Sequence, residues 1–165
     1  MQRRKTLILL TVVALCAHHA HAKPTEKKKD ATPDVVAYND GVDLLKKRRY
    51  PQAQKKFEEA LATNAKFAEA HSNLGYVLRK QGAEHHDKAL EHYNKAIKLN
   101  RKLAPAYAYR GALFVLMGDK TKAEADYKTL EALDEKAARE LRRVIDTGRE
   151  SSAKEKHGIV GEHGW

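Results

Sequence analysis

The residues of this chain that could perform chemistry are few, and the densest group is His85-His86-Asp87. Imidazole and carboxylate groups are common metal ligands, but three adjacent ligands rarely converge on one ion without a fourth from elsewhere. No His-x3-His pair on one helix face is directed at this cluster. The pattern therefore predicts solvated histidines and an Asp87 that caps the following helix, and it predicts no metal site.

Groups suited to catalysis are equally sparse. The single cysteine, Cys16, lies in an apolar N-terminal stretch, and neither serine nor threonine stands in a nucleophile-elbow setting. The chain has no glycine-rich phosphate loop. Glu58 and Glu59 are neighbours on one predicted helix, whereas acid/base catalysis needs carboxyl groups placed around a substrate. The sequence therefore predicts a protein that is not an enzyme and that needs no cofactor.

Composition limits the size and the partners of the folded part. The chain has 165 residues, which is a normal length for one domain, and its 7% of aromatic residues favours a thin stack of helices over a deep core. The formal net charge is +10. Acidic and basic residues are nevertheless interspersed through residues 33–148, so the charge does not indicate a nucleic-acid partner.

Three copies of one pattern organise the chain, at residues 34–67, 68–103 and 104–137. Glycine recurs within the first predicted helix of each copy, and alanine followed four residues later by an aromatic residue recurs in the second. These positions are Gly41, Gly75 and Gly111, then Ala53, Ala89 and Ala123, then Phe57, Tyr93 and Tyr127. Small residues that alternate with large ones at helical spacing predict closely packed helix pairs. The second copy is two residues longer, at its mid-repeat turn.

This pattern resembles the tetratricopeptide repeat family, whose Leu-Gly…Ala-x3-aromatic motif recurs every 34 residues. The resemblance implies an all-α solenoid of three helix-turn-helix repeats, each packed only against its neighbours. The bulky residue near the start of a repeat is replaced by Ala37 and His71, and the proline near its end is absent. Arg48 stands where Gly82 and Gly118 end the first helix of the other copies. A left-handed cap costs arginine about 1 kcal/mol relative to glycine, so this turn is expected to be the least regular.

Residues 1–22 have the features of an export signal. Arg3-Arg4-Lys5 precedes an apolar run of about 12 residues, and Ala20-His21-Ala22 provides small residues at a cleavage site. The apolar run is shorter than the ~20 residues that span a bilayer. A retained anchor, or a lipoprotein with lipid on Cys16, is the alternative, although Leu15 stands where a lipoprotein signal has a small residue. An exported chain without cysteine is predicted to be periplasmic, in preference to secreted or lipid-anchored.

The remaining boundaries follow from turn and capping residues. Residues 23–31 predict a charged linker, and residues 32–148 predict the repeat domain, which begins at a Thr32-Pro33 helix start. Thr121 and Glu124 predict a capping box. A capping helix is expected at 134–147, with one apolar face and one polar face. Residues 149–165 predict a flexible tail, and its terminal Trp165 is either incidental or able to dock on the groove or a partner.

In proteins that this chain resembles, the first helix of each repeat lines a concave groove that receives extended peptides or helices. The matching positions imply a protein- or peptide-binding surface; Leu45 and Val115 match as well but are also explained by helix packing. The predicted surface consists of Tyr38, Val42, Ser72, Tyr76, Arg79, Lys80, Ala108 and Ala112. Neither tyrosine is required by the helix-crossing pattern, so both are expected to be available for binding.

The resemblance also bears on one specialised form of binding. Some family members clamp a terminal carboxylate with two asparagines and three basic residues. Only Asn73 matches that set here, because the other four places hold Tyr38, Val42, Pro105 and Tyr109. The sequence therefore predicts no clamp of this kind.

Taken together, the sequence predicts an exported adaptor or scaffold that binds a protein or peptide partner in the cell envelope. Contact with a membrane is expected only transiently through the signal or weakly through the linker. The alternative is an electrostatic binder of anionic envelope lipid or polymer, through the basic linker and Lys46-Lys47-Arg48-Arg49. A cytoplasmic secretion chaperone with three repeats is opposed by the export signal.

Overall fold

A computed structural model describes residues 31–150 of the chain. The predicted export signal, almost all of the linker and most of the tail lie outside the described residues. Within residues 31–150 every regular element is helical, and the predicted all-α class is confirmed. These elements are α1 (Pro33–Lys46), α2 (Tyr50–Thr63), α3 (Ala68–Gln81), the 3-10 turn η1 (Ala83–His85), α4 (His86–Leu99), α5 (Ala104–Leu116), α6 (Lys120–Leu133) and α7 (Glu135–Thr147).

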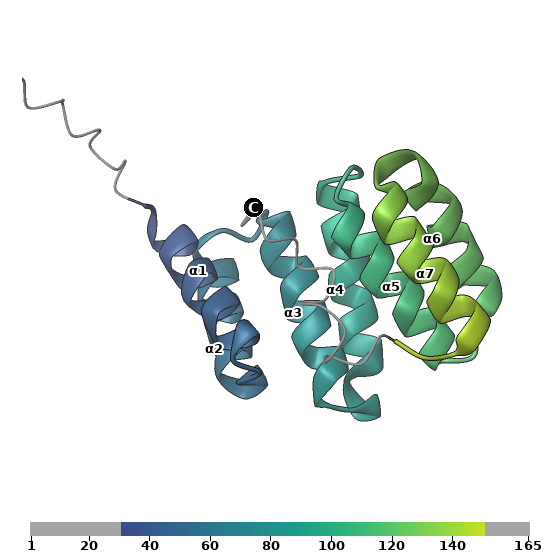
Figure 1. Cartoon of the computed structure of the whole chain (residues 1–165). Helices are drawn as coiled ribbons and strands as arrows, with labels where there is room; N and C mark the ends of the chain where they lie inside the picture. Colours follow the sequence, from purple (N-terminus) through teal and green to yellow (C-terminus); the bar gives the residue numbers. More distant parts are fainter. Residues whose placement is uncertain (1–30, 151–165) are drawn as a thin grey trace, which may run out of the picture. The chain divides into compact units, whose positions relative to one another are not determined.

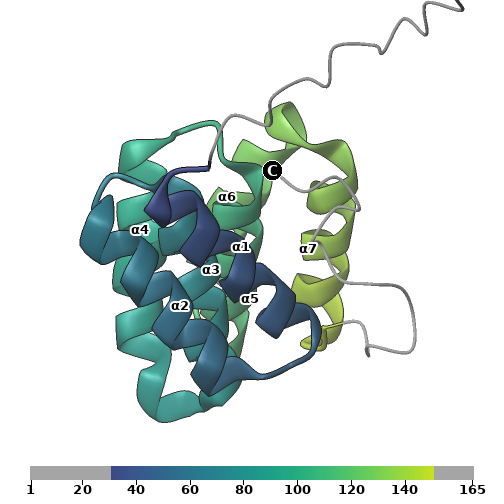
Figure 2. The same ribbon diagram turned by 90° about the vertical axis from the view of Figure 1, so that its left-hand side faces the viewer.

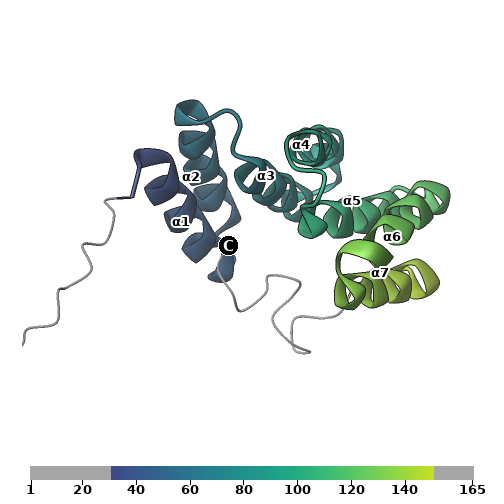
Figure 3. The same ribbon diagram turned by 90° about the horizontal axis from the view of Figure 1, so that it is seen from above.

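The helices form three consecutive hairpins, α1–α2, α3–α4 and α5–α6, followed by α7 (Figure 1). Each hairpin contacts the next one in the chain, so the repeats stack in order. With the first repeat turned toward the viewer, α1 and α2 lie in front of the later helices (Figure 2). The first helices also contact one another directly, α1 with α3, α3 with α5, and α5 with α7. Seen from above, α1, α3, α5 and α7 follow one another along one side of the described domain (Figure 3).

The recurring glycines mark the places where the two helices of a repeat approach most closely. A Cβ atom at Gly41 would lie 2.7 Å from the ring of Phe57, and one at Gly75 would lie 2.8 Å from the ring of Tyr93. Both distances are shorter than van der Waals contact, and both rings are fully buried. The predicted pairing of small and aromatic residues is therefore present in the first two repeats.

The third repeat is closed by a different contact. A Cβ atom at Gly111 would lie 2.5 Å from Leu141 of α7, whereas Tyr127 is only half-buried. The apolar face of α7 packs on α5 and α6 and comprises Ala137, Ala138, Leu141, Val144 and Ile145, which are all buried. The capping helix predicted at 134–147 is present, and it supplies the side chain that fills the last helix crossing.

Three predictions about helix starts are wrong in detail. Thr32 precedes α1 as expected but makes no side-chain capping bond. At the start of α6 the cap is Asp119, whose carboxylate accepts a hydrogen bond from the Lys122 backbone N–H at 3.0 Å, so Thr121 does not cap the helix. Asp87 lies inside the first turn of α4, after the N-cap position of His85. In α4 and α6 the cap therefore precedes its predicted place by two residues.

The turn between α1 and α2 has the expected left-handed residue. Arg48 has φ = +57°, and no other non-glycine residue between 31 and 150 has positive φ. Gly118 at the matching place in the third repeat has φ = +82°. Both turns close with backbone hydrogen bonds to the end of the preceding helix, so Arg48 adopts the geometry that glycine adopts elsewhere in the chain.

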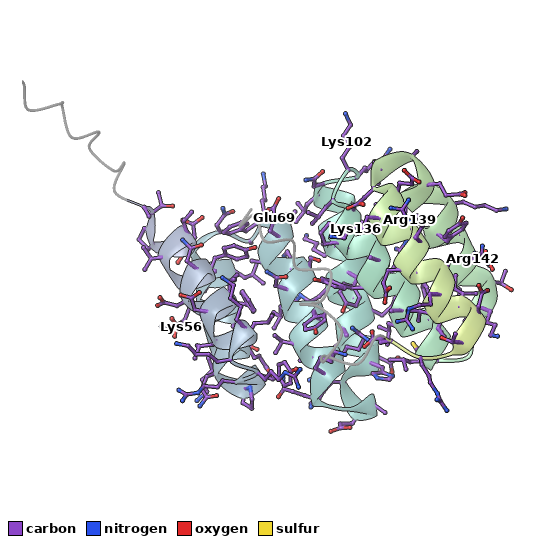
Figure 4. All side chains as sticks on the ribbon, viewed as in Figure 1. Lys56, Glu69, Lys102, Lys136, Arg139 and Arg142 are labelled. Carbon is purple, nitrogen blue, oxygen red and sulfur yellow. The ribbon has the colours of Figure 1, made fainter. Side chains whose placement is uncertain are left out.

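None of the helices between residues 31 and 150 combines the length and the apolar character needed to cross a membrane. Long charged side chains, such as Lys56 and Lys102 in Figure 4, extend outward from the hairpins.

Candidate functional site

The predicted binding residues fall into a buried group and a half-buried group. Tyr38, Ser72, Arg79, Ala108 and Ala112 are each at most 6% exposed. Val42, Tyr76 and Lys80 are half-buried and keep part of their side chains accessible. The first helices α1, α3 and α5 carry all eight, as expected. The accessible three can contact a partner directly. Tyr38, Ser72, Ala108 and Ala112 can only support the surface, whereas the guanidinium of Arg79 is paired with a carboxylate described below. Their role in binding stays a prediction.

Tyr38 is a core residue. Its ring lies 4.7 Å from that of Phe67 and 5.8 Å from that of Phe57, centroid to centroid. Burial raises the pKa of its hydroxyl to about 12. The expectation that this tyrosine is not needed for packing is therefore wrong, because the ring fills the space between α1, α2 and the start of α3.

The carboxylate-clamp position has an internal partner. The side-chain amide of Asn73 donates a hydrogen bond to the Tyr38 hydroxyl at 3.1 Å. Of the other matching places, Tyr109 is 4% exposed and packs its ring against that of Tyr76 at 4.8 Å. These residues hold α1, α3 and α5 together.

The half-buried surface of α3 concentrates positive charge around one ring. The Arg79 guanidinium carbon lies 5.2 Å from the centroid of Tyr76, and the Lys80 ammonium lies 5.4 Å from the same centroid. Both distances fit cation–π contacts. Burial raises the pKa of the Tyr76 hydroxyl, and the charges of Arg79 and, more weakly, Arg48 oppose the rise.

A carboxylate from the far end of the domain neutralises this region. Glu150, two residues beyond the left-handed cap Gly148, forms ion pairs with Arg79 and with Lys80. The Arg79 side chain is only 2% exposed, whereas that of Glu150 is 28% exposed. Burial acts to raise the pKa of the Glu150 carboxyl, but the two cations outweigh it and the pKa is lowered. Nothing in the repeat pattern indicates this contact, since it joins residues about 70 positions apart.

Three buried polar side-chain atoms of the second repeat have no hydrogen-bond partner that meets ordinary geometry within the described part of the chain. They are the Arg79 Nε, the Ser72 hydroxyl two helical turns earlier in α3, and the Tyr93 hydroxyl of α4. Burial raises the pKa of Tyr93, and the Arg79 charge opposes that rise. Buried polar groups normally find partners, and the Arg79 guanidinium and the Tyr93 hydroxyl are close enough to stabilise each other, so the centre of the second repeat is polar.

A histidine pair joins α3 to α4 on the other side of this repeat. The Nδ1 atoms of His71 and His92 are 3.0 Å apart, and the Nε2 of His71 is 3.2 Å from the carbonyl oxygen of Ala65. That carbonyl can only accept, so His71 carries its proton on Nε2, and its bare Nδ1 accepts from His92. Burial, followed by the His71 charge, lowers the pKa of His92 to about 4. The repeat pattern does not predict this pair.

The outer charged groups are mainly structural. Arg110 of α5 makes hydrogen bonds to both carboxylate oxygens of the buried Asp126, at 3.0 and 2.6 Å. Arg142 of α7, which is labelled in Figure 4, is bidentate to Glu124, at 2.7 and 2.6 Å, and its guanidinium carbon lies 4.1 Å from the centroid of the Tyr127 ring. These bonds tie α5 to α6 and α6 to α7.

The histidine cluster of the long turn has no converging ligands. His85 ends η1, and His86 and Asp87 begin α4, so the three side chains are spread along one helical turn. In residues 31–150 no group of three or more His, Cys, Asp or Glu side chains is placed to hold a metal ion.

Comparison with known proteins supports the architecture. No family model matches the sequence. Photosystem I assembly protein Ycf3 of Rippkaea orientalis is 30% identical over 125 residues, which cover 73% of this chain and 68% of that protein. Human Superkiller complex protein 3 is 32% identical over 131 residues, but the chain spans only 8% of its length.

Solved structures show the same fold. The first TPR of Spaghetti (RPAP3), bound to the HSP90 peptide SRMEEVD, superposes with a TM-score of 0.63 at 22% identity, over 72% of this chain and 94% of that one. The Arabidopsis OM64 TPR domain superposes with a TM-score of 0.64 at 18% identity, over 71% of this chain and 97% of that one.

Stacked helical hairpins with a glycine at each crossing define a helical-repeat protein of the solenoid class. With the repeating sequence motif and these similarities, the chain belongs to the tetratricopeptide repeat family.

Proposed function

We propose that this chain is a non-enzymatic adaptor of the cell envelope that binds a protein or peptide on the surface formed by its first helices. The observation that supports this most directly is the half-buried group Val42, Tyr76 and Lys80, presented by α1 and α3. Tyrosine and basic side chains with a buried, rigid base commonly carry interface energy. Here the buried residues Tyr38, Arg79 and Tyr109 form that base. The peptide bound by the structurally similar TPR of Spaghetti is consistent with this use of the fold.

A selection experiment tests the proposal. Random peptides displayed on phage are selected against the immobilised full-length chain, and recovered peptides are measured by fluorescence anisotropy. Val42→Ser and Lys80→Gln should each weaken binding by about fivefold, or about 1 kcal/mol. Ala62→Ser and Lys122→Gln, at exposed positions of α2 and α6, are the matched controls and should leave binding unchanged. Failure to recover any peptide, or equal weakening by the controls, contradicts the proposal.

The second candidate function is electrostatic binding of anionic envelope lipid or polymer. The observation in its favour is that Lys46, Lys47, Arg48 and Arg49 form an exposed basic turn after α1. Cosedimentation with phosphatidylglycerol vesicles separates the two functions. Lys27→Ser, Lys28→Ser and Lys29→Ser together should weaken vesicle binding if the second is correct, although the basic turn at residues 46–49 remains. They should leave peptide binding intact if the first is correct. Exposed charges act over roughly 8 Å at physiological salt, so vesicle binding should disappear at high salt, whereas peptide binding that depends on Val42 should persist.

A further inference from the structure

We propose that Arg79, Lys80 and the ring of Tyr76 form a binding site for a carboxylate of an acidic, extended segment of a partner protein, and that Glu150 occupies this site until such a segment displaces it. The proposal rests on the proposed function, because it specifies the chemistry of the partner and a form of regulation at the same surface. It follows from the rigidity of the site, from its excess of positive charge and from the placement of Glu150.

The receiving groups are fixed by the fold. Arg79 is 5% exposed, and its guanidinium lies against the Tyr76 ring, which in turn packs on the buried Tyr109. A buried arginine without a counterion is strongly destabilising. Among residues 31–150, Glu150 provides the carboxylate that pairs with Arg79. Arg79 of α3 therefore needs a carboxylate partner, whichever segment or molecule supplies it.

Apart from its ion pairs with Arg79 and Lys80, the Glu150 side chain has few interactions that keep it in place. Glu150 follows the end of α7 at Thr147 and the left-handed Gly148. Its side chain is 28% exposed, and the bonds that it makes within residues 31–150 are those to Arg79 and Lys80. Its departure does not require any helix to move. An incoming carboxylate can therefore replace it while the domain stays folded.

The region carries more positive charge than Glu150 neutralises. The Arg79 guanidinium and the Lys80 ammonium bring two positive charges to the Tyr76 ring. Glu150 brings one negative charge to the same two cations. A segment with several carboxylates complements this arrangement better than the single Glu150 does.

Occupation by the chain's own glutamate reduces the apparent affinity for a partner by the fraction of molecules in which the site is free. Glu150→Gln should therefore raise that affinity. The probe is fluorescein-labelled hexaglutamate, titrated with the full-length chain at low salt and followed by anisotropy. Glu150→Gln should bind it at least about fivefold more tightly than the unmodified chain. Glu135→Gln is the matched control, since it also removes a carboxylate that pairs with an arginine, on the outer face of α7, and it should change binding little.

A second substitution identifies the site. Lys80→Gln in the Glu150→Gln background should remove the gain, whereas Lys122→Gln in that background should keep it. The proposal is overturned if Glu150→Gln and Glu135→Gln bind hexaglutamate equally, or if the higher affinity of Glu150→Gln survives Lys80→Gln. It is also overturned if Glu150→Gln tightens binding to phosphatidylglycerol vesicles but not to hexaglutamate. If hexaglutamate fails but peptides selected by display still depend on Val42, the acidic-partner proposal is wrong and the adaptor function stands. If neither binds, both are wrong.

Discussion

Arg48 carries local backbone strain that a single substitution should relieve. Its φ of +57° is a conformation that glycine adopts without steric conflict. Arg48→Gly should therefore raise the free energy of unfolding by about 1 kcal/mol. Denaturant unfolding measures the change. Lys47→Gly, at the neighbouring position with φ = −80°, is the control and should not stabilise the protein. An unchanged midpoint for Arg48→Gly would mean that the turn is not strained.

His92 should make stability depend on pH. The pKa of His92 is lowered to about 4 in the folded protein, from an ordinary value of 6.5. Above pH 6.5 the ring is neutral in both states. Between pH 6.5 and 4 the unfolded chain takes up a proton that the folded chain refuses, so the free energy of unfolding falls. We expect a loss of about 1–2 kcal/mol, less than the full shift implies because the ring is partly exposed.

Replacing His92 checks this assignment. A glutamine side chain at this position would keep a donor for the bare Nδ1 of His71 and has no proton to gain. His92→Gln should therefore reduce the dependence of the unfolding midpoint on pH between pH 7 and 4.5. Part of the dependence should remain, because burial also lowers the pKa of His71. His86→Gln, at the start of α4, is the control and should leave the dependence as it is. Equal behaviour of the two variants would contradict the assigned role of the histidine pair.

At the scale of helices, the crossing in the second repeat has no spare volume. Ala89 is fully buried, and its carbonyl oxygen would lie 3.0 Å from a Cβ at Gly75. Ala89→Leu should therefore lower the free energy of unfolding by about 1–3 kcal/mol through overpacking. Ala62→Leu, at an exposed position of α2, should be nearly neutral. Thermal unfolding compares the two, and a neutral result at Ala89 would refute the helix pairing.

The contact of α7 with the third repeat can be tested by removing side-chain volume instead of adding it. Leu141 is 1% exposed and fills the space beside Gly111. Leu141→Ala should cost about 2–5 kcal/mol by leaving a cavity. Calorimetric or denaturant unfolding measures the loss. A cost below about 1 kcal/mol would show that α7 is not needed to complete the stack, and that the third repeat is closed by its own helices.

These elements also show how far the sequence determines the fold. The spacing of Gly41, Gly75 and Gly111 was sufficient to predict the helix pairs, because the same kind of helix crossing recurs once in each repeat. The same spacing misplaced Tyr38 on the surface, since the ring's neighbour Phe67 precedes the next repeat. The position of Tyr38 within α1 does not show that the segment containing Phe67, between α2 and α3, packs against its ring.

The contacts that the sequence could not predict are those that do not recur from one repeat to the next. His71 with His92 and Arg79 with Glu150 are separated by 21 and 71 positions, and neither pair recurs in another repeat. A repeating sequence pattern predicts only those contacts that recur in each repeat. The departures from the repeat pattern at Arg48 and His71 were visible in the sequence. The pairing of His71 with His92 became apparent only from the structure.

For the molecule as a whole, the processing of residues 1–22 is the prediction with the widest consequence. If the segment is an export signal, the chain recovered from cells should begin at Lys23, with the sequence KPTEKK. Mass spectrometry of the intact protein, or Edman degradation, reads this terminus. An intact Met1, or a lipid-modified Cys16, would exclude the predicted cleavage and with it the periplasmic assignment.

The ring cluster of the second repeat has an optical consequence. The rings of Tyr76 and Tyr93 both lie near that of Tyr109, with centroid separations of 4.8 Å and 6.2 Å. Tyrosines coupled at such distances give a near-ultraviolet dichroism band that vanishes when their packing loosens. The sole tryptophan of the chain is Trp165, which absorbs further to the red. One sample therefore carries two separable optical signals, a tyrosine signal from residues 38–127 and a tryptophan signal from the last residue of the sequence.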